Sequence, residues 1–189
     1  MITSIYKKVL AAFVAYLLIL NMLTFFTSLS PKALVNPFFI KNRTISMTHL
    51  AKHIVLVAGL GLVTASEEEI NALVNNASEK YDTDPKLIHI MIEVESKGRQ
   101  FAISRTGAMG LMQVMPSTFY YISSGDPFLA EDNIEAGVKY FSRQLKKFGS
   151  VELALAAYNA GPQRVKDGKV PDFGETKHYI KRILSVYNQ

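Results

Sequence analysis

The sequence contains no cysteine among its 189 residues. This absence excludes a disulfide scaffold, thiolate metal sites and a cysteine nucleophile. It does not identify the compartment, because many exported proteins are built without disulfides. With 49% hydrophobic and 20% charged residues, the chain has enough apolar material for a packed core. The length suits one domain, or one domain with an appendage.

Acidic residues are missing from the first third of the chain. All 16 Asp and Glu lie at or after Glu67, whereas residues 1–65 hold six Lys and Arg. The remaining 124 residues carry 15 basic and 16 acidic side chains, a net charge of −1. The sequence pI of about 9.3 therefore comes from the N-terminal third. It is no evidence for binding to nucleic acid, and a membrane is the better partner for this basic segment.

A long apolar run follows the basic pair Lys7 and Lys8. Residues 9–26 contain only one strongly polar side chain, Asn21, and no charge. These 18 residues cover about 27 Å as a helix, close to the roughly 30 Å thickness of a bilayer core. The sequence thus predicts a membrane anchor with its N-terminus in the cytoplasm. A buried core helix is the alternative, although core helices usually carry a polar face.

A second export signal lies at residues 47–65. Lys52 and two histidines precede a short apolar stretch at 54–63. Val63 and Ala65 then suit the −3 and −1 positions of a signal-peptidase site. The stretch resembles a complete signal peptide, and it is too short to span a bilayer alone.

Two interpretations of residues 1–65 stay open. In the first, Met1 is the start and the segment is an anchor followed by a membrane-proximal part. In the second, translation starts at Met47 and cleavage after Ala65 leaves a mature chain beginning at Ser66. Both place the remaining domain, residues 66–189, outside the cytoplasm.

Residues 66–189 are expected to form one mostly α-helical domain. Helix starts are marked by a capping-box pattern at Ser66 and Glu69, by Asp84 before Pro85, and by Pro116. The Gly-, Ser- and Thr-rich stretch at 100–113 is expected to be a small irregular or β-like insert. The expected helices span residues 66–80, 85–98, 116–121, 132–148, 151–159 and 175–187.

Glu95 stands out as a candidate catalytic residue. It ends a nearly all-apolar helix at the edge of a glycine-rich loop. Desolvation and the negative end of the helix dipole both raise a carboxyl pKa, as general-acid cleavage of a glycosidic bond requires. An ordinary surface glutamate is the alternative. Glu93 is a rival, but two residues turn about 200° along a helix, so only one of the pair can face a cleft.

Two further stretches carry polar groups that suit a sugar. In GAMGLMQ, two glycines permit a tight backbone and Gln113 offers an amide that can donate and accept. In AYNAG, Tyr158 gives a flat apolar face and a hydroxyl, next to Asn159. A turn before a core strand and a plain helix C-cap are the respective structural alternatives.

These pieces, in this order, resemble one family. The motifs are Glu95-Ser96, Ser104, GAMGLMQVMP at 107–116, NIEAG at 133–137, AYNAGP at 157–162 and ETKHY at 175–179. They resemble the lytic transglycosylase domain of the soluble-transglycosylase type, in the lysozyme-like superfamily. The resemblance covers residues 70–184. One departure is Gly98, where the family often has an aromatic residue; Phe101 is a partial replacement.

The resemblance implies an α+β lysozyme-like fold and an enzyme that acts on peptidoglycan. Glu95 would be the sole acid and base, cleaving the β-1,4 bond after N-acetylmuramic acid while the sugar's own 6-hydroxyl closes a 1,6-anhydro ring. It implies no metal and no cofactor, and His89 and His178 show no ligand spacing between them. The groove around Glu95 would be lined by six matching residues: Ser104, Gln113, Met115, Tyr158, Asn159 and Tyr179.

Two other functions remain as alternatives. A goose-type lysozyme on the same scaffold would deliver water instead of the 6-hydroxyl, and Asp126 or Glu131 would be its second carboxylate. A non-catalytic wall-binding module of an envelope, secretion or conjugation assembly would keep Glu95 for structure alone. All three readings place the protein in the bacterial cell envelope, on the periplasmic side, with membrane attachment if the N-terminal segment is not cleaved.

Overall fold

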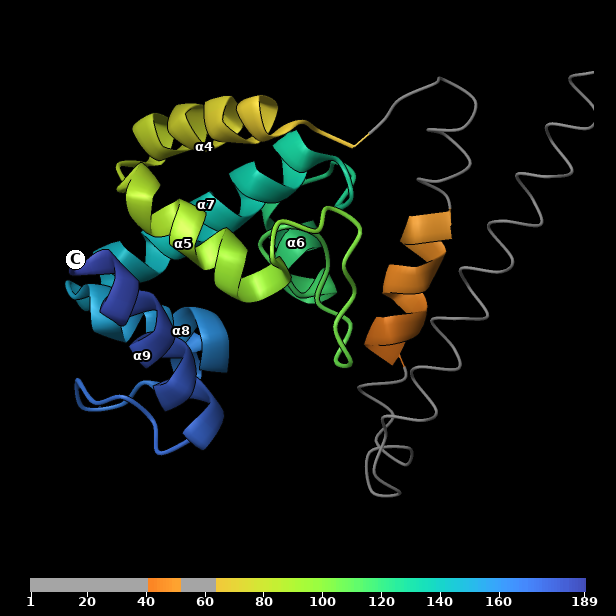
Figure 1. Cartoon of the computed structure of the whole chain (residues 1–189). Coiled ribbons are helices and arrows are strands. Elements are labelled where there is room, and N and C mark those ends of the chain that lie inside the picture. The colour runs from red at the N-terminus through yellow and green to blue at the C-terminus, as the bar shows by residue number, and fades with distance from the viewer. Residues whose placement is uncertain (1–40, 52–63) are drawn as a thin grey trace, which may run out of the picture.

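The computed structural model describes residues 41–51 and 64–189 (Figure 1). Residues 41–51 form a helix that carries no label in the figure. The remaining elements are α4 (Glu67–Tyr81), α5 (Pro85–Ser96), α6 (Pro116–Ile122), α7 (Ala130–Phe148), α8 (Val151–Ala160), the 3-10 helix η1 (Pro162–Arg164) and α9 (Gly174–Tyr187).

The apolar run at 9–26 and the stretch at 54–63 lie outside the described residues. Among the residues that are described, no helix is both long and apolar enough to cross a membrane. The anchor and the signal peptide therefore stay predictions.

Local capping explains where the first two helices of the domain begin. The Ser66 hydroxyl accepts from Glu69 N at 3.2 Å while Glu69 Oε2 accepts from Ser66 N at 2.7 Å, which completes the predicted capping box. Asp84 Oδ1 accepts from Lys86 N at 2.8 Å, and Pro85 occupies the first helical turn. Both predicted starts are confirmed, as is a mostly helical fold.

Helix α7 lies at the centre of the domain (Figure 1). It packs against α4, α6 and α8, while α9 packs against both α5 and α8. Because these contacts converge, the apolar faces of the helices share one core. Its largest fully buried side chains include Met91 from α5, Met112 from the insert, Phe119 from α6, Phe128 and Phe141.

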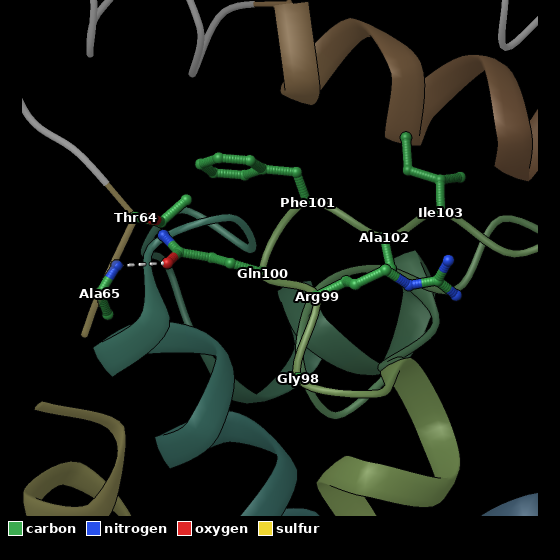
Figure 2. A pocket seen from close by; sticks show the side chains of 8 residues that line it. All are labelled: Thr64, Ala65, Gly98, Arg99, Gln100, Phe101, Ala102 and Ile103. Carbon is green, nitrogen blue, oxygen red and sulfur yellow. Dashed lines mark hydrogen bonds between the residues drawn. The ribbon is translucent and has the colours of Figure 1, made fainter. Parts of the chain in front are cut away.

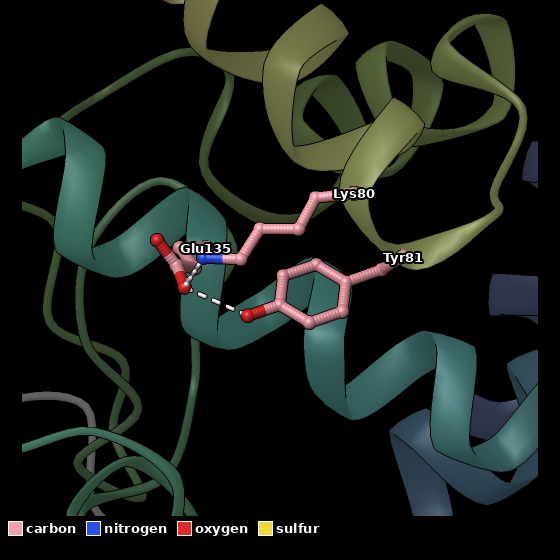
Figure 3. Close-up of polar contacts among 3 residues, drawn as sticks. All are labelled: Lys80, Tyr81 and Glu135. Atoms are coloured by element: carbon pink, nitrogen blue, oxygen red, sulfur yellow. Dashed lines mark hydrogen bonds and ion pairs between the residues drawn. The ribbon is translucent and has the colours of Figure 1, made fainter.

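A polar contact joins the end of α4 to α7 (Figure 3). One carboxylate oxygen of Glu135, Oε1, accepts from Lys80 Nζ and from Tyr81 Oη, each at 2.7 Å. Lys80, followed by Tyr81, lowers the pKa of Glu135. The side chains of Lys80 and Glu135 are both exposed, so their ion pair adds little to the stability of the fold. Its main effect is to fix how α4 and α7 lie against each other.

The stretch between α5 and α6 is the expected small β-like insert. Within the described residues it contains only isolated bridges, Ile103 with Met109 and Met109 with Val114. The insert is held to α7 by Asn133, which is 1% exposed. Asn133 Oδ1 accepts from Met112 N at 2.8 Å, and its Nδ2 donates to the carbonyls of Met109 at 2.9 Å and Pro127 at 2.8 Å.

The chain before Ser66 also contacts the domain. The helix at residues 41–51 lies beside the insert (Figure 1), and its Leu50 belongs to the buried core. Ala65 N donates to Gln100 Oε1 at 2.8 Å, and Gln100 Nε2 donates to the Phe128 carbonyl at 2.9 Å. Hydrogen bonds thus join the described residues on both sides of Ser66. The domain boundary at Ser66 therefore remains a prediction.

Candidate active site

Glu95 lies in the last turn of α5, where the helix is about to end at Lys97. The carboxyl is half-buried, whereas Glu93 is exposed, as their separation of about 200° around the helix requires. Burial raises the pKa of Glu95 from its ordinary value of 4.5 to about 7. A group with such a pKa is partly protonated near neutral pH, and it can both release and take up a proton.

Three groups on α9 modify this effect. The Tyr179 hydroxyl favours the charged carboxylate and lowers the pKa of Glu95, the Glu175 charge raises it, and the Arg182 charge lowers it. Tyr179 is 6% exposed, and its hydroxyl has no fully aligned hydrogen bond among the described residues. The buried Tyr179 hydroxyl thus affects the pKa of Glu95 without a hydrogen bond, within the described part of the chain, that meets geometric criteria.

Tyr158 borders the same carboxyl from α8. Burial, followed by the charge of Glu95, raises the pKa of Tyr158 well above its usual range, and the same two causes act on Tyr179. The Tyr158 hydroxyl donates to the Met112 carbonyl at 2.8 Å, which joins α8 to the insert. Because that hydroxyl is engaged, the ring face is the part of Tyr158 that is suited to a sugar.

The amide of Gln113 was expected to donate to and accept from a sugar, and the structure leaves only its acceptor for that role. Its backbone has φ 48°, in the left-handed region that is uncommon outside glycine. Its amide nitrogen donates to the carbonyls of Ala102 at 3.2 Å and Gly110 at 2.8 Å. The donor side of the amide therefore holds the insert together, and only the carbonyl oxygen is suited to accept from a sugar hydroxyl.

Ser104 and Met115 are joined through Thr106. The hydroxyls of Ser104 and Thr106 lie 2.9 Å apart, and Thr106 Oγ1 lies 4.0 Å from Met115 Sδ. Ser104 Oγ also accepts from Ala108 N at 2.9 Å. These two predicted groove residues thus form a group of their own on the insert. The insert that carries them is joined to α8, beside Glu95, by the bond from Tyr158 to Met112.

Asn159 joins the last turn of α8 to the first turn of α9. Its Oδ1 accepts from the Thr176 hydroxyl at 2.8 Å, so a contact with sugar would have to come from its amide nitrogen. Gly161, with φ 92°, is the C-cap of α8, and its N–H donates to the Ala157 carbonyl at 3.0 Å. The AYNAG motif therefore ends α8 as a plain helix C-cap, and Tyr158 in this motif lies beside Glu95.

Sequence reasoning missed Glu175 and Arg182 as neighbours of Glu95. With Tyr179 they follow the spacing i, i+4 and i+7, which puts all three on one face of α9. That pattern was available, but only the packing of α9 on α5 shows where the face points. Asp126, one of the two carboxylates considered for a lysozyme, lies elsewhere: it accepts from Phe128 N at 2.9 Å. Burial, followed by the charge of Asp126, raises the pKa of Tyr120 to about 12.

An open pocket of about 570 Å³ lies beyond the C-terminal end of α5 (Figure 2). Gly98, Arg99, Gln100 and Phe101 line it together with Thr64 and the start of the insert. Glu95 is not among its lining residues, so this pocket is separate from the carboxyl. In the part of the chain that the structure describes, no three His, Asp or Glu side chains are grouped as a metal site.

Comparisons with known proteins identify relatives of this chain. The chain is 32% identical over 112 residues to the transglycosylase of Enterobacteria phage PRD1, covering 59% of this chain and 40% of that protein. It is 35% identical over 104 residues to membrane-bound lytic murein transglycosylase F of Desulfosudis oleivorans, covering 51% and 23%. The chain thus spans less than half the length of either relative.

Two solved structures share the fold. The lytic transglycosylase Slt of Pseudomonas aeruginosa, solved as an inactive mutant, aligns with a TM-score of 0.55 and 29% identity over 60% of this chain and 22% of that one. The 70 kDa soluble lytic transglycosylase of Escherichia coli aligns with a TM-score of 0.56 at 22% identity over 78% and 28%. Residues 72–180 match the Transglycosylase SLT domain family. The chain belongs to this family.

Proposed function

We propose that this chain is a lytic transglycosylase that cleaves the glycan strands of peptidoglycan, with Glu95 as its only catalytic acid and base. The observation that carries the proposal is the Glu95 carboxyl, whose pKa is raised to about 7 by burial. Such a carboxyl can donate a proton to a glycosidic oxygen at neutral pH. Family membership and relatives named as lytic murein transglycosylases support the same substrate class.

In the proposed reaction, Glu95 donates its proton to the oxygen between C1 of N-acetylmuramic acid and C4 of N-acetylglucosamine, and the bond from C1 to that oxygen breaks. The 6-hydroxyl of the same muramic acid then bonds to C1 and gives its proton to the Glu95 carboxylate. The product carries a 1,6-anhydro ring, and Glu95 ends protonated as it began. Because the substrate supplies the nucleophile, neither water nor a second carboxylate is needed.

The neighbours of Glu95 suit this cycle. Between the two proton transfers the carboxyl is charged, and Tyr179 and Arg182 both favour that form. Tyr158 would offer its ring face to a sugar, Gln113 its amide oxygen and Asn159 its amide nitrogen. Ser104 and Met115 would line the part of the groove that belongs to the insert.

Peptidoglycan as the substrate implies a place in the cell envelope, outside the cytoplasm. The export signals expected in residues 1–65 favour the same location, and several relatives are named as membrane-bound. We propose attachment to the membrane through residues 9–26 if this segment is retained. The partner proposed for the chain besides peptidoglycan is a secretion or conjugation assembly.

One observation favours a hydrolytic lysozyme as the second candidate. Glu175 is exposed on α9, and its charge acts on Glu95. A second carboxylate close to the acid is the arrangement that inverting glycosidases use to activate water. The transglycosylase is the better conclusion, because the sequence motifs and the named relatives agree with it.

Product analysis separates the two candidates. Purified peptidoglycan is digested with the wild-type protein and the muropeptides are weighed by mass spectrometry. The transglycosylase is expected to release products that end in 1,6-anhydromuramic acid and are one water lighter than lysozyme products. Reducing-end muramic acid as the main product would replace the transglycosylase by the lysozyme. Absence of cleavage by the wild-type protein, with glycan still bound, would favour a wall-binding module.

A further inference from the structure

The helix at residues 41–51 covers a turn that follows it by about 60 residues (Figure 1). Two side chains of the helix reach the two ends of this turn, residues 104–107. Arg43 Nη1 donates to the Ser104 carbonyl at 2.7 Å, and Ser46 Oγ donates to the Gly107 carbonyl at 2.6 Å. The buried side chains of the helix lie at positions 42, 43, 46 and 50, which form one face.

Gly107 fits this contact closely. It has φ 91°, and a Cβ placed on it would lie 2.7 Å from Asn42 C and 2.8 Å from Arg43 N. Both atoms belong to the backbone, so the helix could not yield to a side chain by a change of rotamer. Only glycine permits this approach. Gly107 is therefore matched to the helix as well as to its own turn.

A third contact joins the helix to α6. The rings of His49 and Tyr120 lie 4.9 Å apart, centroid to centroid, at an angle of 38°. Tyr120 belongs to the helix that starts directly after Met115. The residues at 41–51 therefore contact the turn that carries Ser104 and also α6, the helix that follows Met115.

The turn positions the Ser104 side chain. Gly107 N donates to the Ser104 carbonyl at 3.1 Å, the same oxygen that accepts from Arg43. Ser104 N donates to the Ala108 carbonyl, and Ala108 N donates to Ser104 Oγ, each at 2.9 Å. A shift of either carbonyl would therefore move the Ser104 hydroxyl, and with it the contact from Thr106 to Met115.

We propose that residues 41–51 are a positioning element of the substrate groove, in which Arg43 and Ser46 hold both ends of the 104–107 turn in the geometry that binds glycan. This inference rests on the proposed function for its substrate. The sequence assigned the N-terminal third to anchoring or export. The proposal gives residues 41–51 of this third a role in substrate binding as well.

Thr48, on the same helix, provides a matched control for substitution of Ser46. Ser46 Oγ lies 3.0 Å from the Asn42 carbonyl, and Thr48 Oγ1 lies 2.9 Å from the Thr44 carbonyl, so both hydroxyls can bond back to their own helix. Only Ser46 also reaches the turn, whereas Thr48 is exposed. Comparison of Ser46→Ala with Thr48→Ala therefore isolates the contact with Gly107.

The experiment uses the full chain and two readouts. Hydrogen exchange at amides 104–108 is expected to accelerate in Arg43→Ala and Ser46→Ala but not in Thr48→Ala. KM for glycan cleavage is expected to rise about 3- to 10-fold in the two test variants, with kcat nearly unchanged, as loss of one hydrogen bond to a positioned turn would give. Arg43→Lys, which keeps a charged donor, should restore part of the wild-type KM.

A double-substitution cycle tests the route of the effect. If Arg43 acts through Ser104, Arg43→Ala should raise KM little further in a Ser104→Ala background. Unchanged exchange in both test variants would overturn the contact, whatever the activity. Faster exchange with an unchanged KM would overturn the role in the groove. A hydrolysed product from the wild type would change the proposed reaction but not this comparison, since KM can be measured for either kind of cleavage.

Discussion

At the scale of single residues, the problem is how one carboxyl serves as both acid and base. A carboxyl with an ordinary pKa is almost fully charged at neutral pH and has no proton to donate. Burial brings the pKa of Glu95 to about 7, and Tyr179 and Arg182 keep it from rising further. The two opposed influences leave Glu95 able to lose a proton and regain it within one cycle.

Replacement of Glu95 by glutamine tests this role. Glu95→Gln keeps the shape of the side chain but removes the transferable proton. General acid–base catalysis typically contributes ~10²–10⁴-fold, so turnover should fall by at least that factor. Binding of glycan, measured by pelleting with purified peptidoglycan, should survive. Glu93→Gln is the control, because Glu93 is exposed and should leave turnover nearly unchanged. Full turnover in Glu95→Gln would show that Glu95 is not the catalytic acid and base.

The pH profile of turnover follows from the raised pKa. Glu95 is protonated below its pKa of about 7, so the general acid is present there and is lost as pH rises through that value. We expect kcat/KM to decline on the alkaline side with a midpoint near pH 7, because this ratio reports the pKa of the acid in the free enzyme. Measurement of kcat/KM on solubilised glycan between pH 5 and 9 would show this limb. A decline centred near the ordinary carboxyl pKa would contradict the effect of burial.

The same pKa predicts a change in stability with pH. The folded state of the wild type holds the Glu95 proton up to about pH 7, and the unfolded state releases it near 4.5. This contribution to stability is therefore complete below pH 4.5 and is lost as pH rises to 7. Glu95→Gln lacks this loss, so its free energy of unfolding relative to wild type should rise with pH. The rise is at most about 3 kcal/mol, and smaller because solvent reaches the carboxyl.

At the scale of elements, Asn133 decides how the insert sits on α7. In Asn133→Ala, one N–H and two carbonyls lose their partner in a buried place. We expect a loss of about 3–5 kcal/mol in the free energy of unfolding, measured with urea. Tyr81→Phe is the matched comparison, since it removes one half-exposed hydrogen bond from α7 and should cost about 1 kcal/mol or less. Equal losses would show that the insert does not depend on Asn133.

Local chemistry let the sequence predict most helices, and tertiary contacts account for the differences. The caps at Ser66 and Asp84 act within a few residues, so both starts could be read directly. Helix α7 begins at Ala130, two residues before the expected 132, because Leu129 provides no side-chain cap that would mark it. The engaged donors of Gln113 were hidden for another reason: its partners, Ala102 and Gly110, are placed by the fold of the insert.

At the scale of the whole molecule, residues 66–189 hold nearly everything that a stable domain needs. The largest buried side chains all come from this range, and residues 41–51 add only Leu50 to the described core. We therefore expect a chain that begins at Ser66 to be soluble and monomeric in size-exclusion chromatography with light scattering. Insolubility that is cured by restoring residues 1–65 would contradict the boundary.

Folding and function need not have the same boundary. A chain from Ser66 loses the donor that Ala65 offers to Gln100 and both contacts that hold the 104–107 turn. If residues 41–51 position the groove, this shorter chain should fold yet cleave glycan with a KM that is raised at least as much as in Ser46→Ala. An unchanged KM would separate the helix from substrate binding.

The last prediction concerns processing in a bacterial host. Cleavage after Ala65 would remove Arg43 and Ser46, and a start at Met47 would omit them. Because both side chains hold the turn that carries Ser104, we expect the active protein in the envelope to retain residues 41–51 and to sediment with membranes. N-terminal sequencing of the membrane and soluble fractions, each assayed for turnover, checks this. A fully active soluble chain that begins at Ser66 would favour the signal peptide and contradict retention. Full-length protein in the cytosol would contradict export by either route.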